Sequence, residues 1–483
     1  MGRDELFGDL PETDAPRPDA AGGGPRLRAP ERDQIELRVV DLDSVIGKDD
    51  PVRAIWAYVE RLDLSELYAR IKSREGRPGH PTIEPRLLVA LWLYATSQGV
   101  GSARALARLC TSHDAYRWLC GGVSVNHHTL ADFRVEQAEL VERLLVENVA
   151  ALASAGVIDL ETLAQDGVKV RAAAGASSFR RRPTLVKSLK KAKRLVARLA
   201  REIKDHPDAS NRRIALARAR AAAERQARVE AALAKLAEIE AAAARRAAKA
   251  EAKKKRQAER KRQAAQTAKA PAQPSRKRQA EKTEKTKKTR APRASTTDPE
   301  ARVMKMADGG FRPAYNVQIA SVPERQIVVA VDPVTSGSDR GLLRPMLEAV
   351  KRRYKTLPRR HLADAAYGKK ADIEPEGAGD PLWAHQNGVL VHCPPLKNKH
   401  RTDPFAARPD DGPGVAAWRR RMKSPAGKSR FKRRALAECI HARCRQWNFH
   451  RLTVRGRAKV RAVMLWFALA NNLLRTRALT QPA

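Results

Sequence analysis

A long basic segment divides the chain into unlike parts. Residues 180–300 hold 38 lysines and arginines against 13 acidic residues, so +25 of the net charge of +41 lies there. Apolar residues recur every three or four positions at 185–203 and again at 229–236, which is typical of a coiled-coil seam, and the segment DHPDASN at 205–211 separates the two runs. We therefore predict a basic helical hairpin, inserted into the domain that flanks it on both sides.

The end of this insert has a different composition. From Lys253 to Arg293 the apolar positions give way to KKKR, RKR and KTEKTKKTR, which predicts a flexible and solvated segment. A basic run binds polyanions without specificity. The insert is therefore open to three interpretations, as a grip on a polyanion, an oligomer seam or a charged spacer.

The net charge restricts the class of partner. A surplus of 41 positive charges over 483 residues favours a nucleic acid, because neutralising phosphates with lysine and arginine releases counterions. A ribosome-like or membrane-surface protein is the alternative. The longest apolar runs, 87–95 and 462–470, are well short of the roughly 20 residues of a membrane-spanning helix, so we expect no membrane segment.

The cysteines and the N-terminus indicate a compartment. The five cysteines form no CxxC pair, which favours reduced thiols. Cys439, His441 and Cys444 lie close together but lack the second half-site that a structural zinc ion needs. The first 20 residues have no apolar stretch typical of a secretory signal. The expected location is the cytoplasm, in association with the nucleoid.

The N-terminal third is predicted to be helical. Residues 1–34, rich in proline, glycine and charged residues, are predicted to be a disordered leader. Residues 45–155 are predicted to form an all-helical domain whose first helix begins at Asp50 and Pro51, a capping residue followed by a first-turn proline. Further helices are expected at 85–96, 102–110 and 113–119, and a longer one from His127 carries an apolar stripe of Leu130, Phe133, Leu140 and Leu144.

Four side chains with aromatic or imidazole rings are candidate DNA contacts. His127 and His128 stand at the start of the longer helix, where a cap or an exposed turn is the favoured interpretation. Trp118 and Trp418 are interpreted as packing residues rather than as base-stacking ones.

After Gly156 the pattern becomes that of an α/β domain. Residues 156–179 contain a strand that ends near Asp166, and residues 301–478 continue the same domain beyond the insert. Alternation around Tyr315 predicts a strand with one buried face, the apolar run 326–331 predicts a more central strand, and later strands end at Asp364 and at residue 393. With helices expected at 339–353, 430–446 and 457–475, we predict a mixed α/β sheet whose first hairpin the insert interrupts.

Three acidic residues stand out by their placement. Asp166 and Asp364 end strands, and Glu438 lies on the helix after the last strand. If those strands are neighbours, their ends converge at the edge where open α/β sheets bind ligands. Three carboxylates so gathered repel one another unless a cation sits between them, and oxygen ligands suit Mg²⁺ or Mn²⁺. The alternative for each acid is a helix cap or a solvated loop residue.

Several motifs resemble those of the transposases of bacterial insertion sequences, in the class with a DDE triad on a ribonuclease-H-like catalytic domain. GRPGHPTIEPRLLVALWLYA, AYRWLCGG and HHTLADFR are similar to their N-terminal domain. QDGVKV, ADAAYG and FKRRALAECIHARCR resemble the segments around the first aspartate, the second aspartate and the glutamate. Ala366 stands where glycine is usual, Phe431 where tyrosine is usual and Arg445 where lysine is usual.

The resemblance implies a role for each matching residue. Asp166, Asp364 and Glu438 are the implied catalytic and metal-binding carboxylates, and Arg434, Arg445 and Tyr367 the implied DNA contacts. Spacing independently places Arg434, Glu438, His441 and Arg445 on one helix face, where a surface salt-bridge row is the alternative.

The implied activity is Mg²⁺-dependent cleavage and strand transfer on double-stranded DNA. The implied substrate is the terminal inverted repeats of the element, and the helical domain at 45–155 is the implied DNA-binding domain. A homodimer is expected, because two element ends must be handled together. Two other functions stay open: a catalytically inactive remnant that binds element ends as a repressor, and a ribonuclease-H-like nuclease without strand transfer.

Overall fold

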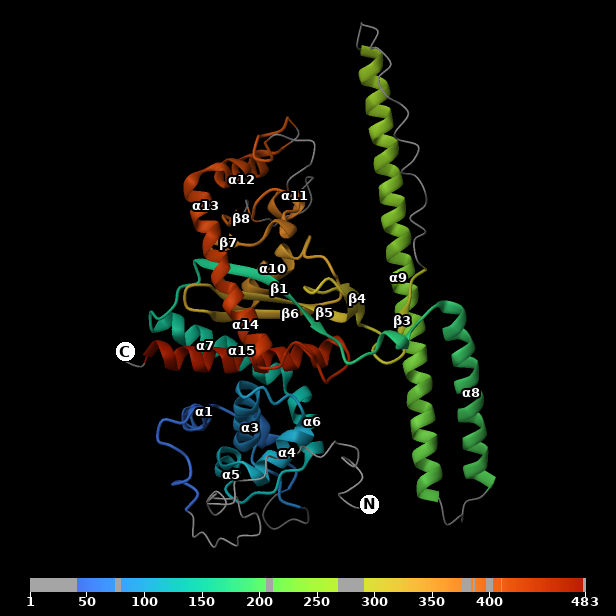
Figure 1. The fold of residues 1–483 in the computed structure, drawn as a ribbon, viewed down its shortest axis with the longest axis vertical. Coiled ribbons are helices and arrows are strands. Elements are labelled where there is room, and N and C mark those ends of the chain that lie inside the picture. The colour runs from blue at the N-terminus through green and yellow to red at the C-terminus, as the bar shows by residue number, and fades with distance from the viewer. Residues whose placement is uncertain are drawn as a thin grey trace, which may run out of the picture.

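The computed structural model describes residues 41–73, 80–205, 212–267, 291–374, 384, 387–396, 403–409 and 411–480. The predicted leader, 1–34, lies outside these ranges. Figure 1 shows a group of short helices, a mixed sheet with helices packed against it, and a long helical hairpin beside them.

Helices occupy the described chain before the first strand. They are α1 (Pro51–Glu60), α2 (Ser65–Ala69), α3 (Pro85–Ser97), α4 (Ala103–Ser112), α5 (Asp114–Cys120), α6 (His127–Glu136) and α7 (Ala138–Ser154). The predicted start of α1 is confirmed, since the Asp50 carboxylate accepts the Val52 N–H at 2.8 Å. The predicted helical character of this region is thus confirmed.

The single long helix predicted from His127 is wrong, because the chain turns at Gln137 between α6 and α7. The apolar stripe is nevertheless buried in both helices. α6 packs against α3 and α4, whereas α7 also reaches β6 (Ile327–Val334) and α10 (Leu343–Tyr354) of the α/β part. Both helices also pack against α15 (Arg457–Thr480), so the turn lets α6 reach α4 and α7 reach the α/β part while both stay in contact with the same long helix.

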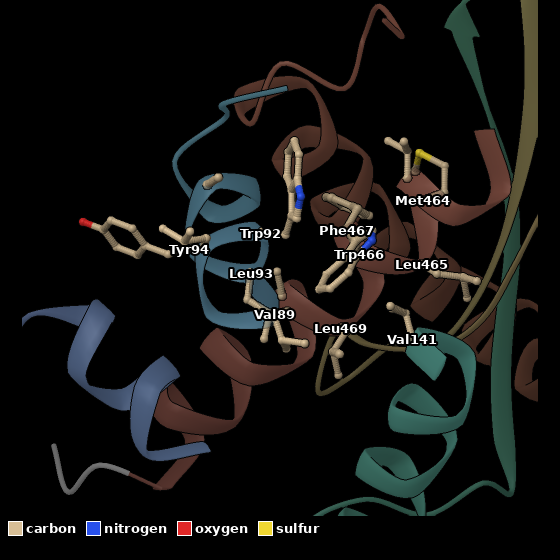
Figure 2. Packing of buried hydrophobic residues seen from close by; sticks show 14 of the residues in the cluster. Val89, Trp92, Leu93, Tyr94, Val141, Met464, Leu465, Trp466, Phe467 and Leu469 are labelled. Atoms are coloured by element: carbon tan, nitrogen blue, oxygen red, sulfur yellow. The ribbon is translucent and has the colours of Figure 1, made fainter. Parts of the chain in front are cut away.

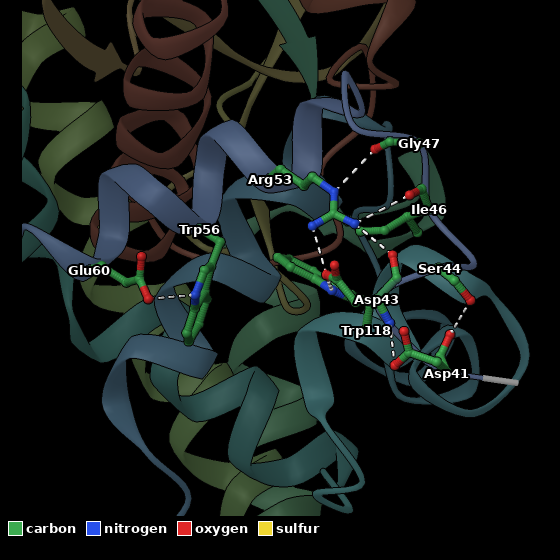
Figure 3. A network of polar contacts seen from close by, with 9 residues as sticks. All are labelled: Asp41, Asp43, Ser44, Ile46, Gly47, Arg53, Trp56, Glu60 and Trp118. Carbon is green, nitrogen blue, oxygen red and sulfur yellow. Dashed lines mark hydrogen bonds and ion pairs between the residues drawn. The ribbon is translucent and has the colours of Figure 1, made fainter.

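A polar network ties α1 to the preceding turn and to α5 (Figure 3). Arg53 Nη1 donates to Asp43 Oδ1 at 2.7 Å, and Trp118 Nε1 donates to the same oxygen at 2.9 Å. These two bonds lower the pKa of Asp43. Trp118 also meets the Trp56 ring edge-on, with centroids 6.4 Å apart. Trp118 is therefore a packing residue, as predicted.

The sheet is mixed and six-stranded. Its order is β4 (Arg302–Lys305), β5 (Phe311–Val322), β1 (Thr162–Arg171), β7 (Arg360–Leu362) and β8 (Leu390–His392), with β6 beside β5. β5 runs antiparallel to β1, β4 and β6, whereas β1, β7 and β8 are parallel. Since β1 and β5 flank the basic segment in sequence, the predicted interruption of the first hairpin is confirmed.

Two expectations about individual strands are corrected. β5 is buried on both faces from Pro313 to Val322, including Asn316 and Gln318, instead of on one face. β6 pairs with β5 alone and is not central. Its apolar run has another cause, because helix α15 (Arg457–Thr480) covers one face of it while α7 and α10 cover the other.

Side chains of α15 satisfy the unpaired edge of β6. Asn472 Oδ1 accepts the Val328 N–H at 2.8 Å, and Asn472 Nδ2 donates to the Val328 carbonyl at 2.8 Å. Asn471 Nδ2 donates to the Gln326 carbonyl at 3.0 Å. Both asparagines are fully buried. An exposed strand edge is a template for unwanted pairing, and these amides occupy it.

We expect Asn472→Leu to lower the free energy of unfolding by about 2–5 kcal/mol, because it leaves a buried N–H and a buried carbonyl without partners. Denaturant unfolding followed by circular dichroism measures the change. Thr476→Val, one turn further along α15, removes only a hydroxyl bond to the Asn472 carbonyl and serves as the control. Equal losses in the two variants would contradict the role given to Asn472.

The two longest apolar runs pack against each other as α3 and α15 (Figure 2). Trp92, Trp466, Phe467 and Leu469 have no exposed surface. The indole N–H groups find backbone partners, since Trp92 donates to the Leu130 carbonyl at 2.9 Å and Trp466 to the Arg134 carbonyl at 3.0 Å. No helix within the described ranges has the length and apolar composition of a membrane span.

The predicted hairpin is present as α8 (Arg182–Asp205) and α9 (Arg212–Thr267). Leu185, Ala192 and Leu199 are the buried residues of α8, and Val229 and Leu236 are buried on α9. At its base β2 (Phe179–Arg180) pairs with β3 (Ala294–Ser295). The two connections of the insert are thereby held side by side.

The prediction of a flexible segment from Lys253 onward is partly wrong. α9 continues as one helix to Thr267, 56 residues and thus about 84 Å in length. Its sequence contains no glycine or proline and consists mainly of alanine, lysine, arginine, glutamine and glutamate, all good helix formers. Propensity alone therefore sustains the helix where the seam has ended, and Figure 1 shows α9 extending far beyond α8.

Candidate active site

The site begins where the parallel pairing of β1 stops. β7 pairs with β1 only across Thr162, Leu163 and Ala164, so the following residues of β1 have no strand on that side. Asp166 is in the middle of β1, not at its end as predicted. Asp364 follows the end of β7 by two residues. The early end of β7 leaves both carboxylates beside the same gap in the sheet.

A helical segment closes this gap from the C-terminal side. The helix predicted at 430–446 is three pieces, α13 (Pro425–Lys432), the 3-10 turn η4 (Arg433–Ala437) and α14 (Glu438–Gln446). η4 packs against β1. Because the 3-10 turn keeps the chain helical, residues four apart stay adjacent, and Arg434 lies 3.3 Å from Glu438. The predicted shared face is confirmed for this pair.

Arg434 joins two of the three predicted carboxylates. Its Nη1 donates to Asp166 Oδ2 at 2.8 Å and its Nη2 to Glu438 Oε1 at 3.3 Å. His441 Nδ1 lies 3.9 Å from Asp166 Oδ2. The Glu438 side chain is 62% exposed, whereas that of Asp166 is 17% exposed. Arg434 therefore lies between the mostly buried carboxylate of Asp166 and the exposed carboxylate of Glu438.

Burial raises the pKa of Asp166, because it removes water from the carboxylate. His441, the Gly167 N–H and Arg434 act in the opposite direction, and Asp364 adds to the rise by repulsion. An additional cation at this place would favour the ionised form of Asp166.

These carboxylates lie in an open cleft of about 590 Å³. Asp166, Asp364 and Asp339 line it together with His441 and with Asp308, which forms an ion pair with Arg312. Basic side chains border the same cleft, namely Lys169, Arg171, Lys305, Arg312 and Arg445. The structure thus brings Asp166, Asp364 and Arg445 to one cleft and leaves Glu438 outside its lining. Carboxylates surrounded by cations suit a phosphate chain bound through a metal ion.

The carboxylates are only partly committed to other bonds. Asp364 Oδ1 accepts the Ala366 N–H at 2.6 Å as the cap of the short turn η3 (Ala365–Tyr367). One oxygen of Asp364 therefore acts as a helix cap, which is the alternative role that the sequence offered for this residue. Among the described residues, no three acidic, histidine or cysteine side chains lie close enough together to hold a metal ion. In chemical type, the carboxylate oxygens fit Mg²⁺ or Mn²⁺.

A buried amide network supports the cleft from inside the sheet. Gln165 Nε2 donates to Gln318 Oε1 at 2.8 Å, and Gln318 Nε2 donates to Asp339 Oδ1 at 2.9 Å. His361 is fully buried beside Gln165, and burial lowers its pKa to about 4, so its ring is neutral at pH 7. Buried polar groups have lost their contacts with water, so they need hydrogen-bond partners of this kind.

Tyr367 belongs to this network, which corrects its predicted role as a DNA contact. The side chain has no exposed surface, and its hydroxyl donates to Gln318 Oε1 at 2.6 Å. Burial raises the pKa of the phenol. Tyr367 therefore positions Gln318 and offers no surface to a ligand.

Sequence reasoning missed Asp339. The sequence predicts a helix that starts at this residue, but α10 begins only at Leu343. The Asp339 carboxylate instead accepts bonds from Asn316 Nδ2 at 2.7 Å and from Gln318 Nε2. The polar pair Asn316 and Gln318 inside an otherwise apolar strand was the available signal, because buried amides need polar partners.

We expect Gly167→Ala to lower the free energy of unfolding by about 1–3 kcal/mol through overpacking. A Cβ at this position would lie 2.5 Å from Gln318 Nε2, 2.6 Å from Asn316 Oδ1 and 2.7 Å from Asp339 Oδ1. Denaturant midpoints measure the loss. Gly47→Ala is the control, since a Cβ there meets nothing within 4 Å. Equal denaturant midpoints in the two variants would show that the buried amide network accommodates the added methyl group without loss of stability.

The remaining residues singled out from the sequence lie elsewhere. Trp418 is buried and its Nε1 donates to the Cys393 carbonyl at 2.8 Å, so it is a packing residue as predicted. His127 and His128 open α6, but the capping residue is Asn126. Cys439 is exposed and Cys444 is buried.

One comparison with known proteins identifies a region of the chain. A family model described as a transposase domain (DUF772) matches residues 40–136. No curated protein and no solved structure matches the chain. The matched region ends at Glu136, the last residue of α6, where the chain turns into α7 and joins the sheet. The helices α1 to α6 are therefore similar to a transposase domain, and this similarity supports a transposase in general as the class of the protein.

Proposed function

We propose that this protein is a DDE-type transposase of a bacterial insertion sequence. It binds the terminal inverted repeats of its element and catalyses Mg²⁺-dependent DNA cleavage and strand transfer. The observation that carries the proposal is the cleft in which Asp166 and Asp364, from neighbouring parallel strands, lie within a basic rim. The transposase domain on the same chain supports it.

The α/β part is proposed to be a ribonuclease-H-like catalytic domain. The mixed sheet is compatible with this, having an antiparallel half built on β5 and a parallel half of β1, β7 and β8. The carboxylates stand at the junction of the two halves. Open α/β sheets bind their ligands at such switch points.

The proposed cofactor is Mg²⁺ or Mn²⁺. Asp166 and Asp364 would hold it, with Glu438 as the third carboxylate of the set. When bound, such ions stabilise the attacking and leaving oxygens of an in-line displacement at phosphorus. Arg434 donates to both Asp166 and Glu438 and so holds the two carboxylates in place, and Arg445 contacts a phosphate from the edge of the cleft. His441, buried beside Asp166, orients the carboxylate.

Other parts of the chain would hold DNA away from the cleft. The helical domain grips the element end, and the exposed basic residues of α9 hold the backbone without regard to sequence. The working form is proposed to be a homodimer that brings two ends together. Its proposed location is the cytoplasm, on nucleoid DNA.

The test is incubation of the purified protein with labelled duplex carrying its own element end, in Mg²⁺ and in EDTA, beside Asp364→Ala. Cutting at the element boundary that requires the metal and disappears in the variant is the expected result. Binding without cutting under every metal tried would favour the repressor remnant. Ends that are cleaved but never joined to target DNA would favour the nuclease.

A further inference from the structure

A second pocket lies away from the cleft, between the helical domain and the segment that leads into α15. It has a volume of about 340 Å³ and is open to solvent on one side. Its lining includes Ser102, Arg104, His127, His128, Arg134 and Thr453. No acidic residue is among the side chains that line it.

Arg134 is a buried cation at the wall of this pocket. Only 4% of its surface is exposed, and its guanidinium lies 4.5 Å from the centroid of the Trp92 ring. Nη1 donates to the Gly101 carbonyl at 2.7 Å, but Nε is buried without a hydrogen-bond partner. Within the described ranges Arg134 has no salt bridge to a carboxylate. A buried charge without a counter-ion is costly, so an anion bound in this pocket would stabilise Arg134.

Two helices begin at the same pocket. Ser102 caps α4, and Asn126 caps α6 by accepting the N–H groups of His128 and Thr129 at 2.9 Å each. The N-terminal end of a helix carries a partial positive charge and attracts anions. Both helix N-termini and the buried Arg134 thus contribute positive charge to the pocket.

The exposed cation Arg104 and two histidine rings complete the surroundings. Arg104 lies in the first turn of α4, and the His127 and His128 rings have centroids 4.1 Å apart. Loss of water, His128 and Arg104 together lower the pKa of His127.

We propose that this pocket binds one phosphate group of the DNA backbone. The inference rests on the proposed function, since it takes DNA as the partner. The transposase-domain match covers every lining residue except Thr453 and Val454, which come from the C-terminal part of the chain. A phosphate held here would anchor the duplex on the helical domain while another part of it occupies the cleft.

The experiment measures binding of the full chain to labelled duplex carrying the element end at several salt concentrations. Arg104→Gln is the main variant, because Arg104 is exposed and its replacement does not disturb the core. We expect its affinity to fall about fivefold and the slope of log K against log salt to become shallower by about 0.9, the value for one lost phosphate contact. Arg108→Gln, also exposed on α4 but outside the pocket, is the matched control and should stay within about twofold.

A second arm uses inorganic phosphate alone. It should raise the melting temperature of the wild-type protein and of Arg108→Gln, and have a smaller effect on Arg104→Gln. Phosphate stabilisation with DNA affinity unchanged in Arg104→Gln would overturn the assignment to DNA and leave a site for free anions.

The outcomes separate this inference from the proposed function. Wild-type protein that binds and cuts the element end, with Arg104→Gln and Arg108→Gln indistinguishable in salt slope, would overturn the pocket alone. Wild-type protein that binds no DNA at all would overturn both. Normal cleavage by Arg104→Gln at saturating DNA, together with the reduced affinity, supports a binding role distinct from the cleft.

Discussion

Asp166→Asn should reduce metal-dependent cleavage of the element end by at least about three orders of magnitude. The amide keeps the size of the side chain and can still accept the Gly167 N–H, but it loses the negative charge that would bind the metal. Affinity for DNA should change little, because the cations that border the cleft remain. Single-turnover cleavage and duplex binding, measured on the same preparation, check both parts.

The matched control is Asp159→Asn, which makes the same change at an exposed aspartate just before β1. It should cleave like the wild-type protein. Cleavage by Asp166→Asn within tenfold of Asp159→Asn would remove Asp166 from the proposed metal site.

The same assay decides which third carboxylate completes the set. Glu438 is bonded to Arg434 and stands outside the cleft lining, whereas Asp339 lines the cleft but is bonded to Asn316 and Gln318. We expect Glu438→Gln to lose cleavage as fully as Asp166→Asn, and Asp339→Asn to retain more of it. The reverse order would assign the third position to Asp339.

Leu469→Ala is expected to lower the free energy of unfolding by about 2–5 kcal/mol. Leu469 has no exposed surface and lies on α15, in the cluster that joins α3 to the sheet. Truncation would leave a cavity between rigid helices, which cannot close without moving α15. Denaturant unfolding measures the change.

Leu436→Ala is the control for the same substitution. Leu436 is 38% exposed on η4, so its truncation should cost less than about 1 kcal/mol. Unfolding of the helical domain separately from the sheet in Leu469→Ala would show that α15 couples the two. A loss no larger than that of Leu436→Ala would contradict the central place given to this cluster.

Local signals predicted the elements well where periodicity or capping was strong. Asp50 with Pro51 located the start of α1, and the apolar spacing in the insert predicted the helical hairpin and the seam on which Leu185, Ala192 and Leu199 are buried. The spacing of Arg434 and Glu438 predicted their contact even though the helix is interrupted by a 3-10 turn. In each case the deciding interactions lie within a few residues or along one helix face.

Predictions failed where a distant element decides the outcome. The turn at Gln137 lets α6 reach α4 and α7 reach the α/β part while both contact α15, and Asn472 of α15 bonds to the unpaired edge of β6 at Val328. Tyr367 matched a motif that implied a DNA contact, but Gln318 on β5 takes its hydroxyl inside the sheet. None of these partners is near in sequence.

The sequence by itself determined the start of α1, the presence of a helical hairpin in the insert, where the basic charge lies, and which acidic residues are candidates for a chemical role, because propensity, period and composition act along the chain. Only the tertiary structure decided that Asp339 shares a cleft with Asp166 and Asp364, that Arg434 stands between Asp166 and Glu438, and that Arg134 is buried without a counter-ion. Those facts depend on which side chains lose water together, and that is set by the packing of elements far apart in the chain.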